Sequence, residues 1–355
     1  MKLSADELNQ YSRHLLLDQV GTNGQLKLKQ AKVLVIGAGG LGCSVLQHLS
    51  AAGIGVIGIV DDDLVDQSNL HRQVLYKTHD IGKFKVRCAK KALEAINPYI
   101  TIKIHTARLN TSNAIELFSA YDIIVDGTDN FPTRYLSNDA SVLTNKPLVF
   151  GSIFKFDGQV SVFNYKNGPT YRCLYPSPPT VGSVPNCSEI GVLGVIAGII
   201  GSLQANEVLK IILDLGNILS GNVLTFNALS MKQSILSFEK NLSMNVKTLD
   251  TDYQLFCGMP EIVREIPFQE YKKQSKNFNL LDVRTLKERA EFSINSIHIP
   301  INELPRRLHE LPQNKNLIVF CESGMRSKRA IQILRANNFK KELINLKDGL
   351  KNVTF

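Results

Sequence analysis

The chain has 355 residues, of which 44% are hydrophobic and 21% are charged, and this ordinary balance excludes disordered and fibrous classes of protein. Lys and Arg exceed Asp and Glu by 9, but without dense basic clusters, so we expect an acidic protein partner and no nucleic-acid site. The first residues include acidic ones and form no apolar core of signal-peptide length, which predicts a cytoplasmic protein.

The stretch "KVLVIGAGGLG" reads as an apolar strand followed by a glycine loop. Gly37, Gly39 and Gly42 fit the pattern G-x-G-x-x-G, and a helix is predicted to follow at about residues 41–52. Asp61 ends the next strand, at the separation expected of a ribose-binding carboxylate. Taken alone, this pattern indicates a dinucleotide site, so an NAD-dependent oxidoreductase is one interpretation.

The segments that follow alternate between strands and helices. Strands are predicted at "TIKIHTARL" and "YDIIVDGTDN", and helices at about residues 83–96 and 113–119. This alternation predicts an α/β fold with a Rossmann-like, doubly wound, mainly parallel sheet covered by helices. From "KPLVFGSIFKFDGQVSVFNY" onward the pattern changes to strands joined by short turns, which predicts an antiparallel extension of the sheet.

The longest apolar run, residues 190–203, is shorter than a membrane span and leads into polar residues. We therefore predict a buried helix and no membrane association. Glycines recur in the run at spacings of three and four residues, so another backbone can approach one face closely, either across a subunit interface or within one domain.

A domain boundary is predicted near "FCGMPEIVREI", which divides the chain into residues 1–257 and 258–355. The second part repeats the alternation of strand, loop and helix on a smaller scale, and its length suits a small independent α/β domain.

Several polar residues after Asp61 have no use in hydride transfer. Arg72 and Lys85 can neutralise phosphate oxygens, and Asp129, at the carboxyl end of a strand, can hold Mg²⁺. Asn69 and Asn130 stand close to them in the motifs "SNLHRQ" and "GTDN". These residues favour a triphosphate over a dinucleotide.

At these motifs, and at "GKFKV" and "GVLGVIAGIIGSLQANEVLK", residues 3–257 resemble the HesA/MoeB/ThiF family of adenylyltransferases, which are relatives of the ubiquitin-activating enzymes. The resemblance implies that ATP and Mg²⁺ are used to adenylate the C-terminal glycine of a small ubiquitin-fold sulfur-carrier protein ending in Gly-Gly. It also implies a homodimer in which Arg13 reaches the ATP of the neighbouring subunit, and it makes Asp129 the Mg²⁺ ligand. The implied nucleotide-binding residues are Gly37, Gly39, Gly40, Gly42, Asp61, Ser68, Asn69, Arg72, Lys85, Asp129 and Asn130.

A second chemistry is indicated near the C-terminus, where Cys321 follows an apolar strand and precedes a helix. Inward-facing N–H groups, the start of the helix and the Arg326 guanidinium would stabilise a thiolate or a persulfide on Cys321. From about residue 261 the chain resembles a rhodanese domain, with the six-residue loop "CESGMR" and the earlier "LLDVR". The resemblance implies sulfur transfer through a Cys321 persulfide, and we expect Asp282 and Arg284 to be structural.

Together the two domains predict one reaction sequence, in which adenylation of the carrier is followed by sulfur transfer that yields a thiocarboxylate. The resemblance implies a place in molybdopterin, thiamin or tRNA thiolation pathways, with thiosulfate or a cysteine desulfurase as the sulfur source. Cys187 precedes the apolar helix and is either a transient acceptor of the acyl group or sulfur, or an ordinary loop thiol. A non-catalytic scaffold that binds carrier proteins is a further alternative.

Many members of the family carry two C-x-x-C pairs that bind a structural zinc. Here those stretches read "TYRC" and "QLFC", so only Cys173 and Cys257 remain, and two thiolates cannot complete a four-ligand site. We therefore expect no zinc. Cys173 and Cys257 are either unpaired thiols, which we expect, or neighbours that pair loosely. We expect Cys43 and Cys88 to be core residues.

Overall fold

The computed structural model describes residues 2–179, 191–257, 263–337 and 339–350. Its contacts divide the chain into two compact units, residues 1–258 and 259–355, each with its own sheet. The two units are therefore described separately.

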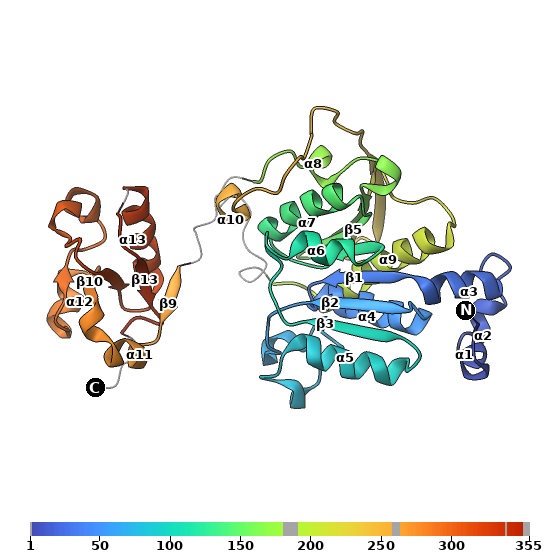
Figure 1. Cartoon of the computed structure of the whole chain (residues 1–355), viewed down its shortest axis with the longest axis horizontal. Coiled ribbons are helices and arrows are strands. Elements are labelled where there is room, and N and C mark those ends of the chain that lie inside the picture. Colours follow the sequence, from blue (N-terminus) through green and yellow to red (C-terminus); the bar gives the residue numbers. More distant parts are fainter. Residues whose placement is uncertain (1, 180–190, 258–262, 338, 351–355) are drawn as a thin grey trace. The chain divides into compact units, whose positions relative to one another are not determined.

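Unit 1 is built on an eight-stranded sheet in the order β3-β2-β1-β4-β5-β6-β7-β8. Figure 1 shows β3, β2 and β1 side by side. The first five strands in this order are parallel and the last four pair antiparallel, which confirms the predicted mainly parallel sheet with an antiparallel extension. The strands are β1 (Lys32–Ile36), β2 (Val56–Val60), β3 (Thr101–His105), β4 (Ile123–Asp126), β5 (Leu148–Phe154), β6 (Asp157–Phe163), β7 (Asn222–Asn227) and β8 (Lys232–Ser237).

The parallel strands are connected by helices, as the alternating sequence pattern predicts. The predicted helices at about residues 41–52, 83–96 and 113–119 correspond to α4, α5 and α6. The longer helices of unit 1 are α3 (Gly21–Gln30), α4 (Gly40–Ala52), α5 (Lys85–Ile96), α7 (Phe131–Thr144) and α9 (Gly194–Leu213), and the shorter ones are α1 (Ala5–Gln10), α2 (Ser12–Leu15), α6 (Ala114–Ser119), α8 (Tyr171–Leu174) and α10 (Tyr253–Phe256). Strand order reverses between β1 and β4, which is the place where open α/β sheets bind ligands.

The parallel strands carry near-continuous apolar sequences because both faces of this part of the sheet are covered. Every residue of β1 after Lys32 is buried, and so is every residue of β4. The helices begin and end where the sequence supplies capping groups: the Asn130 side chain accepts the Thr133 N–H at the start of α7, and Gly53, with φ of +84°, ends α4.

Among the described residues, one helix, α9, is long and apolar enough to cross a membrane, judged by length and composition alone. The helix continues ten residues past the predicted apolar run, which ends at Leu203, and reaches Leu213. In its most apolar stretch of 18 residues, 44% of the helix is buried inside unit 1, where α9 packs against α4, β5 and β6. A Cβ added at Gly194 or Gly201 would clash with backbone atoms of this unit, whereas a Cβ added at Gly198 would meet open space.

Unit 2 has a five-stranded parallel sheet in the order β11-β10-β12-β13-β9. Its strands are β9 (Arg264–Ile266), β10 (Phe278–Asp282), β11 (Ile297–His298), β12 (Asn316–Phe320) and β13 (Leu343–Leu346), and its helices are α11 (Phe268–Lys273), α12 (Leu286–Glu291) and α13 (Met325–Ala336). Two apolar clusters pack on this sheet, one including Leu281, Leu317 and Leu334 and the other including Phe320 and Leu346. The predicted smaller α/β fold is confirmed.

A substitution at Gly42 can test how much the tight turn between β1 and α4 contributes to stability. A Cβ at Gly42 would lie 2.0 Å from the Gly37 carbonyl oxygen, so Gly42→Ala must push two backbone segments apart. We expect Gly42→Ala to lower the free energy of unfolding by about 3 kcal/mol, measured by urea denaturation. Gly39→Ala is the matched control, because the nearest atom to its Cβ is a side-chain nitrogen at 3.8 Å. Equal stability of the two variants would contradict this account of the turn.

Candidate functional site

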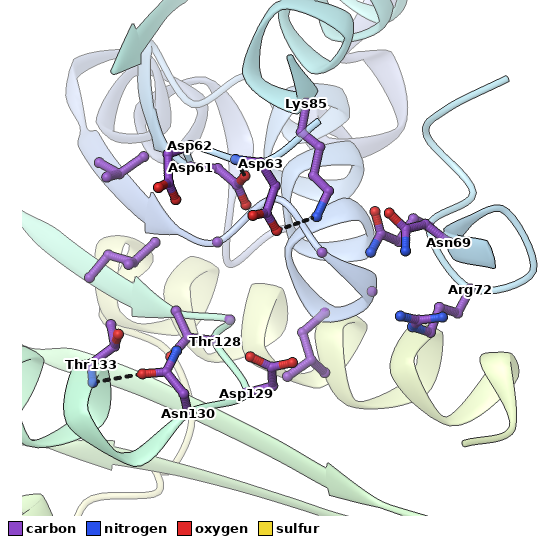
Figure 2. A pocket seen from close by; sticks show the side chains of 18 of the residues that line it. Asp61, Asp62, Asp63, Asn69, Arg72, Lys85, Thr128, Asp129, Asn130 and Thr133 are labelled. Carbon is purple, nitrogen blue, oxygen red and sulfur yellow. Dashed lines mark hydrogen bonds and ion pairs between the residues drawn. The ribbon is translucent and has the colours of Figure 1, made fainter. Parts of the chain in front are cut away.

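A cavity of about 650 Å³ opens at the carboxyl edge of the parallel strands in unit 1, at the reversal point between β1 and β4. Its walls come from the ends of β1, β2 and β5, from the loop after β4 and from the start of α4. Figure 2 shows the polar side chains that these segments contribute. Nine predicted nucleotide-binding residues line it: Gly37, Gly39, Gly40, Asp61, Asn69, Arg72, Lys85, Asp129 and Asn130. Residues that are up to 93 positions apart in the sequence therefore share one pocket.

The glycine loop presents the amino end of α4 to this cavity. Gly37 has φ of +87°, a conformation that strongly favours glycine, and its N–H donates to the Val60 carbonyl at 2.9 Å. Gly39 precedes the helix and Gly40 begins it, so the unpaired N–H groups of the first turn and the positive end of the helix dipole lie at the pocket. This arrangement suits an anionic group such as a phosphate.

Asp61 lies at the end of β2 with its carboxylate oriented by two backbone groups. Its Oδ2 accepts the Ala38 N–H at 2.7 Å, and its Oδ1 accepts the Asp63 N–H at 2.9 Å. Burial raises the pKa of Asp61, and these N–H groups oppose that shift. A carboxylate oxygen accepts more than one hydrogen bond, so Asp61 retains capacity for a ribose hydroxyl.

Lys85, the first residue of α5, is held by Asp63. Its Nζ lies 2.7 Å from Asp63 Oδ2, and its backbone N–H donates to the Asp63 carbonyl at 3.0 Å. The Lys85 side chain is only 6% exposed, whereas that of Asp63 is 67% exposed. The cation is thus fixed at the wall of the cavity while its partner remains largely in solvent.

Asn69 and Arg72 belong to the turn after β2 and lie on the same side of the pocket (Figure 2). The Arg72 guanidinium donates to the Ser68 carbonyl at 3.0 Å and lies 2.7 Å from His71 Nε2. Asn69 Oδ1 accepts the Asp66 N–H at 3.2 Å. Arg72 has no carboxylate partner among its hydrogen bonds in the described part of the chain, so its charge is available to an anion.

Asp129 and Asn130 enter the pocket from the loop after β4 (Figure 2). The loop is anchored below by Asp126, whose Oδ1 accepts both the N–H and the hydroxyl of Thr128, at 2.9 and 2.6 Å. Arg134 donates to the Thr128 carbonyl at 3.2 Å. Asp126 is buried, whereas Asp129 is exposed and can present its carboxylate to a ligand.

Mg²⁺ fits this arrangement, because the ion is commonly held by one or two carboxylates together with substrate phosphates. Within the described ranges, no group of three or more His, Cys, Asp or Glu residues is placed to hold a metal by itself. Asp129 would therefore supply a protein oxygen, and the phosphates would supply others.

Three residues predicted at the nucleotide site, Arg13, Gly42 and Ser68, do not line the cavity. Gly42 packs against Gly37, so its role is to allow the turn, and the Ser68 hydroxyl donates to Asp66 at 2.6 Å. Arg13 is exposed on α2, and its predicted place at a neighbouring subunit's ATP stays a prediction. Cys187 lies outside the described residues.

Other residues that line the pocket were not predicted as nucleotide-binding residues. Arg108 and Lys155 add cations from the segments after β3 and β5, and Gln73 is buried with its Oε1 unpaired. Only the "SNLHRQ" motif signalled Gln73, and nothing in the local sequence signalled Arg108 or Lys155. Asp63 was missed because three consecutive aspartates give no sign of which one faces Lys85.

The two cysteines left from the family's zinc pairs lie in unit 1 near an ion-pair cluster. Cys173 Sγ accepts the N–H groups of Thr170 and Asn241, each at 3.3 Å, and burial raises the pKa of Cys257 to about 11. Beside Cys173, Arg172 makes two hydrogen bonds of 2.7 Å to Asp139 and stacks on Phe256, with 4.6 Å from its Cζ to the ring centroid.

The Tyr253 hydroxyl donates to the same Asp139 at 2.6 Å. Helices α8 and α10 therefore both contact α7, through hydrogen bonds to Asp139 and through aromatic contacts. The expected absence of zinc stays a prediction. Cys43 and Cys88 are buried, as expected of core residues.

Cys321 in unit 2 lies between β12 and α13, in the loop that was predicted to carry sulfur chemistry. Gly324, with φ of +83°, turns the chain into α13, and Cys321 is fully buried. The Ser327 hydroxyl lies 3.5 Å from Cys321 Sγ and donates to Asn345 Oδ1 at 2.6 Å. The sulfur therefore has a hydroxyl neighbour, Ser327, within an otherwise apolar core.

Arg326, the other predicted residue of this site, is paired with Glu288 of α12. Its two terminal nitrogens lie 2.7 and 2.5 Å from the two Glu288 oxygens. The carboxylate raises the pKa of Arg326, and Cys321 contributes to the same shift, so the guanidinium lies near both groups. Arg284 and Asp282 form a buried ion pair of 2.9 Å, as expected of structural residues.

These features define a two-unit α/β protein that joins a phosphate-directed nucleotide pocket to a small parallel sheet bearing a cysteine loop. Residues 11–246 match the ThiF family and residues 268–354 match the rhodanese-like domain, which confirms both resemblances. The chain belongs to the ThiF family and carries a C-terminal rhodanese-like domain.

Similar proteins cover most of the chain. The probable adenylyltransferase/sulfurtransferase MoeZ of Mycobacterium tuberculosis is 40% identical over 98% of this chain and 93% of that protein. The adenylyltransferase and sulfurtransferase MOCS3 of Drosophila sechellia is 40% identical over 97% of this chain and 82% of that protein. The sulfur carrier protein adenylyltransferase of Thermus thermophilus is 48% identical over 73% of this chain and its own full length.

Solved structures of E. coli MccB share the fold of the larger part of the chain. The structure with MccA-N7isoASN is 23% identical with a TM-score of 0.59, and it matches 69% of this chain and 75% of that chain. The structure with ATP is 25% identical with a TM-score of 0.58, and it matches 67% and 74% of the two chains.

Lys85 can be tested by a change that keeps its buried aliphatic stem. We expect Lys85→Met to lower kcat/KM for ATP about 100-fold, because the developing phosphate charge loses a fixed cation. Stability should change little, because Asp63 is mostly in solvent. Lys83→Met is the control, since Lys83 is exposed and does not line the cavity. Equal kinetics in the two variants would remove Lys85 from the site.

Proposed function

We propose that this protein uses ATP to adenylate the C-terminal glycine of a small ubiquitin-fold sulfur-carrier protein ending in Gly-Gly, and then converts the adenylate to a thiocarboxylate with sulfur carried on Cys321. The observation that carries the proposal is the set of phosphate-directed groups in one cavity, opposite the carboxylate of Asp129. The adenylyltransferase and sulfurtransferase names of relatives at 40 to 48% identity support both halves.

In the first step a carboxylate oxygen of the carrier attacks the α-phosphorus of ATP, and the bond from that phosphorus to pyrophosphate breaks. The reaction needs alignment and charge neutralisation more than a protein nucleophile. Asp61 would orient the ribose, the start of α4 would receive phosphate oxygens, and Arg72 and Lys85 would neutralise charge as pyrophosphate departs. Mg²⁺, with Asp129 as its protein ligand, would neutralise further phosphate charge when bound.

In the second step the outer sulfur of a Cys321 persulfide attacks the acyl carbon. The bond between that carbon and the phosphate oxygen breaks, and AMP leaves with its electron pair. The product is an acyl disulfide. A thiol then attacks the Cys321 sulfur, and the S–S bond breaks with its electron pair on the released thiocarboxylate. A second molecule of an external thiol reduces the resulting disulfide and restores the Cys321 thiolate. Cys187 keeps its predicted alternatives in this scheme, a transient acceptor of the acyl group or sulfur or an ordinary loop thiol. Either thiosulfate or a cysteine desulfurase would recharge Cys321.

The active form in this proposal is a homodimer that completes each ATP site with the neighbouring Arg13. The exposed position of Arg13 and the incompletely buried apolar helix α9 support it. The thiocarboxylate would supply molybdopterin, thiamin or tRNA thiolation pathways. An NAD-dependent oxidoreductase would have no function for Arg72, Lys85 and Asp129. A non-catalytic scaffold would have no function for Cys321.

Asp129 provides the test of the adenylation half. Asp129→Asn should reduce carrier-dependent exchange of pyrophosphate with ATP at least about 100-fold, because the metal loses its carboxylate ligand. Asp122→Asn is a matched control just before β4, where the side chain accepts the Lys32 N–H and makes no other hydrogen bond within the described ranges. Full exchange by the Asp129 variant would refute the metal role, and nicotinamide turnover without exchange would refute the proposed reaction.

Cys321 provides the test of the sulfur-transfer half. Cys321→Ser should abolish both persulfide loading, followed by mass spectrometry, and thiocarboxylate formation, because a hydroxyl cannot carry transferable sulfur. Exchange of pyrophosphate with ATP should remain at the wild-type rate. Thiocarboxylate formation by this variant with a persulfide donor would show that the sulfur bypasses unit 2.

A further inference from the structure

The Cys321 loop ends in a cation whose charge is already neutralised. Arg326 has both terminal nitrogens on the two oxygens of Glu288, at 2.7 and 2.5 Å, in the bidentate geometry that is strongest for Arg and carboxylate. The Glu288 side chain is 27% exposed and that of Arg326 is 36% exposed, so the pair is partly shielded from water.

Glu288 is also fixed from its own helix. It stands in the first turn of α12, where Thr285 and Glu288 form a capping box. Its Oε2 accepts both the N–H and the hydroxyl of Thr285, at 2.9 and 2.7 Å. Arg326, followed by Thr285, lowers the pKa of Glu288 to about 2, so the carboxylate is ionised at every pH above about 3.

A second carboxylate belongs to the loop itself. Glu322, next to Cys321, is 47% exposed and lies 3.6 Å from Arg284. Arg284 is buried and already paired with Asp282 at 2.9 Å, so it offers little charge to an incoming anion. A small dianion approaching Cys321 thus meets a paired Arg326 and a half-exposed Glu322.

We propose that Glu288 determines which sulfur donor charges Cys321: by neutralising Arg326 it disfavours small dianionic donors such as thiosulfate and favours persulfides, R–S–SH, whose transferable sulfur carries at most one charge. The inference rests on the proposed function of Cys321 as a sulfur acceptor. Glu288 acts through Arg326 and is a specificity-determining residue.

The loading step is balanced with either donor. The Cys321 thiolate attacks the outer sulfur of the donor, a new S–S bond forms and the donor's S–S bond breaks. Its electron pair leaves on sulfite when the donor is thiosulfate, or on the thiolate R–S⁻ when it is a persulfide. No further oxidant or reductant is needed, so only recognition of the donor distinguishes the two.

The test compares the full-length protein with Glu288→Gln, which keeps the capping box because Gln serves at that position as well as Glu. With thiosulfate as donor and cyanide as acceptor, we expect KM for thiosulfate to fall about tenfold in the variant. This KM should also rise more steeply with ionic strength than in the wild type, because an unpaired Arg326 now binds the anion. Loading from glutathione persulfide, followed by mass spectrometry, should stay within about twofold of wild type.

Glu310→Gln is the matched control, because Glu310 forms a bidentate pair with Arg307, at 2.7 Å for each bond, elsewhere in unit 2. It removes the same charge and should leave KM for thiosulfate unchanged. In the double variant Glu288→Gln with Arg326→Gln, the gain in thiosulfate affinity should disappear.

An unchanged or higher KM for thiosulfate in Glu288→Gln, with loading from glutathione persulfide intact, would overturn the inference and leave the proposed function standing. Failure of the wild type to load sulfur on Cys321 from either donor would instead overturn the proposed function.

Discussion

The close contact between the backbones of Gly37 and Gly42 is the constraint on which the nucleotide site depends. Because Gly42 has no Cβ, α4 begins immediately after β1, and its unpaired N–H groups lie at the carboxyl edge of the sheet. Gly127, at the end of β4, packs against the same place, with its N–H donating to the Ile36 carbonyl at 2.9 Å. The loop that carries Asp129 is thereby brought to the same cavity as Asp61. A side chain at Gly42 would separate these groups, whatever their identities.

Each unit places a carboxylate beside a cation of its predicted site, Asp63 beside Lys85 and Glu288 beside Arg326. The two pairs are expected to affect the binding of anions differently. Asp63, beside Lys85, is mostly in solvent and has no side-chain hydrogen bond other than Lys85 among the described residues, so a phosphate can replace it at little cost. Glu288, beside Arg326, is fixed by its capping box and binds both guanidinium nitrogens, so it is hard to displace. The first arrangement holds a cation ready for an anionic substrate. The second pair, Glu288 with Arg326, keeps the cation from binding an anionic substrate in our proposal.

Much of the fold followed from periodicity, because parallel strands covered on both faces need long apolar runs and their crossovers need amphipathic helices. The apolar run of α9 was predicted to lead into polar residues after Leu203, and the helix continues through them, with Gln204 and Glu207 buried within it. Gln204 donates to the Asp126 carbonyl at 2.8 Å, and Glu207 accepts from Lys210 and from the Leu219 N–H. Buried polar residues with partners inside a helix cannot be distinguished from a solvent-exposed turn by composition.

The sequence by itself determined the strand, glycine loop and helix of the nucleotide site, the cysteine loop and the residues whose charges suit phosphates, because these depend on local spacing. Only the tertiary structure decided which charges are free and which are paired. Asp63 was one of three adjacent aspartates, and Glu288 stood 38 residues before Arg326, so neither pairing had a local signal. Ion pairs form between side chains that the fold brings within about 4 Å, and that distance is set by how strands and helices pack, not by their order in the chain.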